Sequence, residues 1–351
     1  MTWVPLLLAD PSPCLRLLVL RELFDLKDIN PEFVELTTMR ESDPLAVGIL
    51  RFQQNDGSWS LGTTATGRIG GSRTLATGFA LTRLGYLGFD RSHPAVKLGA
   101  EYLFSTQLSD GSWPLEEEAA LTDGNSDLPP EERYSMIPLQ TAFPLRGLAA
   151  CGYAEEARSE KAYEWLLSKR LADGAWPTGI AAGVYGNVGG YRRLAHSRWG
   201  CRTNTTGALI CLAYHPKRRT SPEAQKALDL LLGRETRDAY ALGVETARMI
   251  GVEPARGFLT YFARFDLALL LDLCARVGAS PNDNRVKAAT DFVSGLQGEF
   301  GLWEHPSDPR VSRWLTFDLL RSLSQIGQAE DWIASEPPTP FQPYSKLKRR
   351  Y

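Results

Sequence analysis

The stretch Gln53-Gln-Asn-Asp-Gly-Ser-Trp59 decides the fold, because the chain repeats it. It recurs as Gln107-Leu-Ser-Asp-Gly-Ser-Trp113 and as Arg170-Leu-Ala-Asp-Gly-Ala-Trp176, and Gln297-Gly-Glu-Phe-Gly-Leu-Trp303 keeps Gln, Gly and Trp. Arg234-Glu-Thr-Arg-Asp-Ala-Tyr240 is in register with these copies and has Tyr in place of Trp. The five aromatic positions are spaced by 54, 63, 64 and 63 residues. Such regular self-similarity indicates a repeat architecture.

A second pattern follows each copy of the first. Thr77, Thr141 and Thr316 each have Leu at offsets 4 and 7 and Gly at offset 11. Thr205 has the two leucines, and Asp266 takes the place of Thr in the fourth repeat. Offsets of 4, 7 and 11 mark one stripe of an α-helix, and the closing Gly is typical of a helix C-cap.

The repeats contain two kinds of helix. The stretches at 94–103 and 221–230 start with Pro at the first turn and keep a polar face, whereas the Thr/Leu helices are apolar nearly all round. We therefore expect an all-α protein, an α/α toroid with a buried inner ring and a half-exposed outer ring of helices. Five repeats are clear, and a helix at 12–26 would supply the inner helix of an incomplete sixth. The predicted toroid spans residues 10–328, followed by a Pro-rich basic tail at 329–351.

Composition excludes several classes of protein. The chain of 351 residues has a net charge of −2, so no nucleic-acid partner is expected. Its five cysteines are odd in number and scattered, which favours a reduced, cytoplasmic protein. The first ten residues do not resemble a signal peptide, and no apolar run is long enough for a transmembrane segment. The basic stretch at 346–350 permits only weak contact with a membrane surface. The oligomeric state is not predicted.

These repeats resemble those of squalene–hopene cyclases and protein prenyltransferase β subunits, and more closely those of uncharacterised prokaryotic prenyltransferase-like proteins. The resemblance covers residues 10–328 and is specific for the fold. It implies that the Gln and Trp residues are structural, with Gln capping helix ends and the indoles of Trp59, Trp113, Trp176 and Trp303 packing over turns. It also implies an isoprenoid or other apolar ligand, which could carry a diphosphate.

The connections from outer to inner helices are long, as in Trp113 to Thr141 and Trp176 to Thr205. In an alternating ring these connections share one end, so we expect the mouth of the site there. Arginines in and beside these connections suit an anionic group, and aromatic faces near the inner-helix starts suit a cation. The alternatives are solvated charges and ordinary core packing. The predicted substrate-binding residues are Tyr134, Phe143, Trp199, Arg202, Tyr261, Arg264, Arg313 and Trp314.

The predicted catalytic residues are Asp266 and Asp318. A carboxylic acid in an apolar lumen has a raised pKa and can act as a general acid. The alternative is that these side chains cap their helices or pair with Arg264 and Arg313.

The catalytic motifs of the resembled families are absent from the sequence. It contains neither the D-x-D-D tetrad of class II terpene cyclases nor the D-D-x-x-D motif of class I enzymes, and Cys201, near an inner-helix start, lacks the matching Asp of the D-x-C pair in the prenyltransferase zinc site. His196, Cys201 and His305 have no recognisable metal-ligand spacing, which favours loop or packing roles over an unorthodox metal site, and no cofactor is expected. Two hypotheses remain. The protein is a terpene-cyclase-like or prenyltransferase-like enzyme acting on an apolar substrate in a central cavity, or a ligand-binding or scaffold toroid without catalysis.

Overall fold

The computed structural model describes residues 3–26, 30–60, 73–113, 137–177, 180–181, 184–185, 193–233, 241–253, 263–306 and 308–328. The expected tail at 329–351 and most of the long outer-to-inner connections lie outside these residues. Within them the chain is helical apart from two short strands, β1 (Ile180–Ala181) and β2 (Val184–Tyr185), which pair antiparallel.

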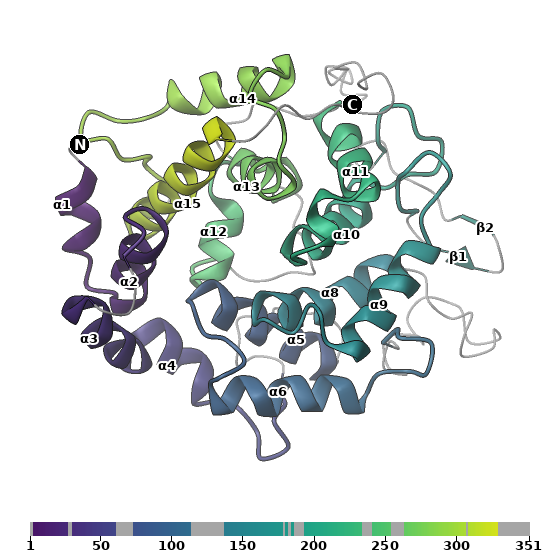
Figure 1. The fold of residues 1–351 in the computed structure, drawn as a ribbon, viewed down its shortest axis with the longest axis horizontal. Coiled ribbons are helices and arrows are strands. Elements are labelled where there is room, and N and C mark those ends of the chain that lie inside the picture. The colour runs from purple at the N-terminus through teal and green to yellow at the C-terminus, as the bar shows by residue number, and fades with distance from the viewer. Residues whose placement is uncertain are drawn as a thin grey trace, which may run out of the picture.

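The helices form the inner and outer rings of an α/α toroid (Figure 1). The inner helices are α2 (Pro13–Glu22), α5 (Arg73–Tyr86), α8 (Ile137–Ala150), α10 (Arg202–Tyr214), α13 (Leu267–Val277) and α15 (Pro309–Gln328). Around them lie α3 (Pro31–Met39), α4 (Pro44–Leu50), α6 (Pro94–Ser105), α9 (Ala157–Ser168), α11 (Pro222–Leu232) and α14 (Asn284–Ser294). The helix α1 (Trp3–Leu8) precedes the predicted start of the toroid and packs on α2 and α15. Short 3₁₀ turns occur at Arg40–Ser42, Arg218–Thr220 and Ala263–Phe265.

The outer helices begin where the sequence predicts. In α11, Pro222 occupies the first turn and the Ser221 hydroxyl accepts the N–H of Ala224. In α6, Pro94 has the same place and His93 caps the helix. A missing proline N–H costs nothing in the first turn, because that N–H has no helical partner there.

The four tryptophans of the repeated motif make one recurring contact. The indole N–H of each donates to the backbone carbonyl ten residues earlier, at 2.7–2.9 Å; the acceptors are Ile49, Leu103, Leu166 and Val293. The side chain of Gln53 donates to the carbonyls of Gly57 and Ala95, so it joins its own turn to the start of the next outer helix. These bonds agree with the structural role expected of the motif.

The inner helices follow one another around the ring, α5 beside α8, then α10, α13 and α15. Between α5 and α15 the Tyr86 hydroxyl donates to the Asp318 carboxylate at 2.8 Å, and the ring of Trp314 lies 5.5 Å from that of Tyr86. Because Tyr86 and Asp318 are 232 residues apart in sequence, this contact closes the ring. An open solenoid has no such contact.

A further helix, α12 (Val244–Met249), lies inside the ring (Figure 1). It belongs to the long connection between Tyr240 and α13, and its residues from Glu245 to Met249 are all buried. Side chains of α5, α8, α13 and α15 bond to it from different sides. The sequence predicts that this connection lies at the rim of the ring, around an apolar lumen. Residues 244–249 instead lie inside the ring, so the prediction is wrong for this part of the connection. Glu245, Thr246 and Arg248 bring polar groups into the lumen.

Candidate functional site

A pocket in the lumen lies between α12 and the inner helices. Its lining residues are Tyr86, Arg146, Tyr214, Glu245, Thr246, Met249, Ala268, Leu269, Asp272, Asp318 and Arg321. Its cavity volume is about 30 Å³, which is room for a few water molecules and too little for an isoprenoid. With α12 in place, the pocket is therefore small, and both polar and apolar groups line it.

Asp318 of α15 lies on the wall of this pocket and is 7% exposed. One carboxylate oxygen accepts from the Tyr86 hydroxyl and the Thr246 hydroxyl, each at 2.8 Å, and the other accepts from Arg321 at 3.2 Å. Burial raises the pKa of Asp318, and the Arg321 charge and the two hydroxyl bonds only partly offset this effect. The Asp318 carboxyl is thus fixed by three hydrogen bonds, and burial shifts its equilibrium toward the protonated form.

Asp272 of α13 shares Arg321 with Asp318 but has the opposite tendency. Its carboxylate accepts from Arg276 at 2.8 Å and from Arg321 at 2.9 Å. Burial opposes ionisation, but the charges of Arg276 and Arg321 outweigh burial and lower the pKa of Asp272. Arg321 also pairs with Glu22 at 3.3 Å. Its guanidinium therefore forms ion pairs with three carboxylates, those of Glu22, Asp272 and Asp318. Opposite pKa shifts in two neighbouring carboxyls are the usual arrangement for separating an acid from a fixed anion.

Glu245 on α12 is held by two arginines. Arg146 of α8 donates to one carboxylate oxygen at 2.7 Å, and Arg248 on α12 itself donates to the other at 2.6 Å. Burial opposes ionisation of Glu245, but these two cations lower its pKa overall. The carboxylate is therefore an ionised group in the centre of the ring, 5% exposed as a residue.

Asp266, the other predicted catalytic residue, is the N-cap of α13 and is 2% exposed. Its carboxylate accepts the N–H groups of Gly243, Glu245 and Ala268 at 2.8–3.0 Å. Burial raises its pKa to about 7 in spite of these three donors. Asp266 does not line the pocket described above, and its contacts hold α12 against α13. Its predicted catalytic role stays a prediction, and these contacts match the capping alternative.

The aromatic residues predicted to bind substrate have different neighbours where the structure describes them. Phe143 is buried on α8 with its ring edge toward Phe79, at a centroid distance of 6.2 Å. Trp314 is buried on α15 beside Tyr86, near the pocket. Trp199 is 37% exposed and is covered by the guanidinium of Arg198. Tyr134 and Tyr261 lie outside the described residues.

The predicted arginines bond to the protein itself. Arg202 donates to the carbonyl of Arg264 at 2.9 Å, and Arg264 donates to the Thr203 hydroxyl at 3.0 Å. Arg313 pairs with Asp10 at 3.1 Å, which ties α15 to the residues before α2. These bonds support the helix packing, and substrate binding by the three arginines stays a prediction.

His196, Cys201 and His305 are in different surroundings. His196 is exposed, Cys201 is the buried residue before α10, and His305 accepts the N–H of Asp308. In the described part of the chain, no three His, Cys, Asp or Glu side chains are grouped so that they could hold a metal ion.

Sequence reasoning missed Tyr86, Arg146, Asp272 and Arg321, although a signal for three of them existed. Arg146 and Arg321 each come five residues after the reference Thr of their repeats, within otherwise apolar helices. Asp272 comes six residues after Asp266, in the repeat whose closing Gly is also one residue late. These equivalent positions face the lumen. A charged residue there, off the leucine stripe, marks the side of the inner helix that faces the pocket.

The sequence is similar to those of known cyclases. Residues 36–187 match the family model of the squalene-hopene cyclase C-terminal domain. Lanosterol synthase of Candida albicans is 32% identical over 160 residues, 45% of this chain and 20% of that protein. Squalene–hopene cyclase of Zymomonas mobilis is 28% identical over 151 residues, 43% of this chain and 21% of that protein. The chain thus spans about a fifth of the length of these two relatives.

Solved structures with a similar fold include a type II terpene cyclase from Scytonema, at 15% identity and a TM-score of 0.33 over 81% of this chain and 96% of that one. A variant of that cyclase with bound geranylgeranyl dihydroxybenzoate has 15% identity and a TM-score of 0.35, over 81% and 95% of the two chains. The sequence matches confirm the predicted resemblance to the terpene cyclase superfamily. No helix in the described parts of the chain has the length and apolar character needed to cross a membrane.

Proposed function

We propose that this terpene-cyclase-like protein acts on an isoprenoid or similar apolar substrate in the lumen of its ring, with Asp318 as the proton donor. The observation that carries the proposal is the pair of carboxyls that share Arg321. The pKa of Asp318 is raised and that of Asp272 is lowered, and both side chains line the pocket. A carboxyl whose pKa is raised beside a fixed anion is suited to general acid catalysis.

The reaction step that this geometry supports is protonation of a carbon–carbon double bond. The proton leaves the Asp318 carboxyl for one alkene carbon, the π electrons form the new C–H bond, and the other carbon becomes cationic. The carboxylate left behind is stabilised by the hydroxyl of Tyr86 and by Arg321, both on the ring itself. The aromatic rings of Tyr86 and Trp314, next to this acid, suit stabilisation of a cation.

A second candidate function is ligand binding or scaffolding without catalysis. The filled lumen favours it, because the present pocket admits only a few waters and its carboxylates are bonded to neighbouring side chains. Under this hypothesis Asp318 is a tether between α5, α12 and α15, and its removal lowers stability without affecting any reaction.

The test is to incubate the protein with farnesyl diphosphate, geranylgeranyl diphosphate and squalene, and to measure both binding and product formation. Product formed by the wild type and lost in Asp318→Asn, with binding retained, supports the acid role. The Asp266→Asn variant is the comparison, since it also replaces a buried carboxyl with a raised pKa, at a position that does not itself line the pocket. Binding without product favours the second function. No binding of any of the three compounds rejects the isoprenoid substrate.

A further inference from the structure

The helix α12 occupies the lumen through polar contacts as well as apolar ones. Arg83 of α5 donates to the Met249 carbonyl at 2.8 Å, and Arg146 of α8 donates to Glu245 at 2.7 Å. Asp318 of α15 accepts from Thr246, and Asp266 at the start of α13 accepts the N–H groups of Gly243 and Glu245. All of these bonds come from side chains of the ring to one six-residue helix.

Such a short helix depends on its surroundings, because isolated helices of this length do not persist in water. Its first residue follows Gly243, whose φ of 80° gives the chain a left-handed turn into the lumen. Because α12 is one short segment held in place by side chains of the ring, loss of those contacts would release it as a unit.

The cost of its departure falls on the two ring arginines. Arg83 and Arg146 are 7% and 5% exposed, and burial lowers the pKa of Arg83 to about 10. Departure of α12 takes from Arg83 the Met249 carbonyl and from Arg146 the Glu245 carboxylate. Loss of a buried ion-pair partner is unfavourable. An anion that enters the lumen as the helix leaves would restore the pairing with Arg146.

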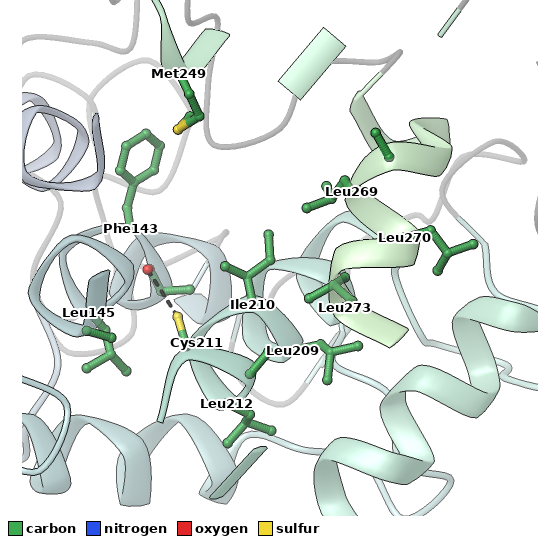
Figure 2. Close-up of a cluster of buried hydrophobic side chains, with 14 of the residues drawn as sticks. Phe143, Leu145, Leu209, Ile210, Cys211, Leu212, Met249, Leu269, Leu270 and Leu273 are labelled. Atoms are coloured by element: carbon green, nitrogen blue, oxygen red, sulfur yellow. Dashed lines mark hydrogen bonds between the residues drawn. The ribbon is translucent and has the colours of Figure 1, made fainter. Parts of the chain in front are cut away.

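The apolar surroundings of α12 define the rest of the entering molecule. Met249 points toward the ring of Phe143 on α8, and Ile210 of α10 and Leu269 of α13 lie in the same buried cluster (Figure 2). The space that α12 fills thus has cationic groups on α5 and α8 and an apolar wall formed by α8, α10 and α13. This distribution matches a molecule with one anionic end and one apolar end.

We propose that α12 is an internal stand-in for the ligand. In this role its Glu245 carboxylate occupies the place of a carboxylate on an apolar ligand, and the ligand enters by displacing α12 and pairing with Arg146. The inference rests on the proposed function and adds to it the head group of the ligand and the competition with α12. Glu245 fixes the choice of head group, since it presents a carboxylate to Arg146 in the unliganded protein.

The experiment compares farnesoic acid with farnesol, which has the same tail without the carboxylate, and with acetate, which has the carboxylate without the tail. We expect farnesoate to bind the wild type about tenfold more tightly than farnesol, acetate not to bind, and Arg146→Gln to remove the preference. We expect Glu245→Gln to tighten farnesoate binding by about tenfold, because the internal competitor is weakened. The control is Glu160→Gln, since Glu160 also contacts two basic side chains, His215 and Arg218, on the outer helices. It should leave farnesoate affinity within about twofold.

Amide hydrogen exchange over residues 244–249 gives the second readout, and exchange there should rise when farnesoate binds. If Glu245→Gln fails to fold, Thr246→Val is the substitute, because it removes the bond to Asp318 and leaves Arg146 untouched. The inference is overturned if farnesoate binds while α12 stays equally protected, or if loosening α12 does not raise affinity. Binding of farnesol or squalene in that case leaves the proposed function standing. No binding of any apolar probe to the wild type or to Glu245→Gln defeats both.

Discussion

Thr246 on α12 and Asp318 on α15 are joined by a hydrogen bond of 2.8 Å, although 72 residues separate them. The same carboxylate oxygen accepts from Tyr86 of α5, so one buried side chain links the closure of the ring to the helix in its lumen. Asp318 therefore connects the closure of the ring to the position of α12 in the lumen.

The first prediction concerns the protonation of Asp266. Burial raises its pKa from the usual 3.8 to about 7, so the folded protein binds this proton more tightly than the unfolded chain. The resulting stability is fully present below the unfolded pKa and is lost as pH rises through about 7. Between pH 8 and pH 5, the unfolding free energy of the wild type should rise by about 2–3 kcal/mol relative to Asp266→Asn. Urea denaturation of both proteins at several pH values measures this difference, and parallel pH profiles would show that Asp266 is ionised throughout.

The second prediction concerns the charge cluster around Arg321. Replacing Arg321 by Met leaves the buried carboxylates of Asp272 and Asp318 and the carboxylate of Glu22 without their shared cation. Removing one partner of a buried ion pair costs about 3–5 kcal/mol. The control is Arg310→Met, which breaks an exposed pair with Asp308 and should cost about 0–1 kcal/mol. Equal losses in the two variants, measured by thermal or urea unfolding, would contradict the buried network.

The third prediction concerns the repeated tryptophans. Trp176 is fully buried, and Trp176→Ala should cost about 3–5 kcal/mol through the cavity that it leaves. Trp176→Phe keeps part of the ring but removes the bond to the Leu166 carbonyl, so a smaller loss of about 1–3 kcal/mol is expected. Ligand binding should survive in the folded Phe variant, because the indole is remote from the pocket-lining residues. A specific loss of binding at unchanged stability would assign this position to the site.

The sequence predicted the ring because its evidence is local and repeated. A leucine stripe, a closing Gly and a Gln-to-Trp turn each report on a few residues of chain, and the same bonds appear at Trp59, Trp113, Trp176 and Trp303. Asp266 shows where this reasoning reached its limit. Its register with the reference Thr residues was read correctly, but Thr77 and Thr316 lie inside their helices and Asp266 lies before α13. In the fourth repeat a 3₁₀ turn at Ala263–Phe265 precedes Asp266, the α-helix begins only after it, and its carboxylate accepts N–H groups at the starts of both α13 and α12.

The pocket was harder to predict because it depends on contacts between distant segments. Asp318 was identified as a candidate from its place in an apolar helix, but its partners Tyr86 and Thr246 are 232 and 72 residues away. The position of α12 had no sequence signal of its own, since a six-residue helix with Glu and Arg resembles an exposed loop segment. Its burial depends on polar side chains of α5, α8 and α15 that bond to it, and these come from three other repeats.

The most direct test of the account is a double-mutant cycle between Arg146 and Glu245, with Arg146→Met, Glu245→Gln and the double variant compared by urea unfolding. These side chains belong to α8 and α12 and are 2.7 Å apart in a buried setting. The account predicts a coupling free energy of about 1–3 kcal/mol. A coupling of zero, with both single variants folded, would mean that α12 does not lie in the lumen.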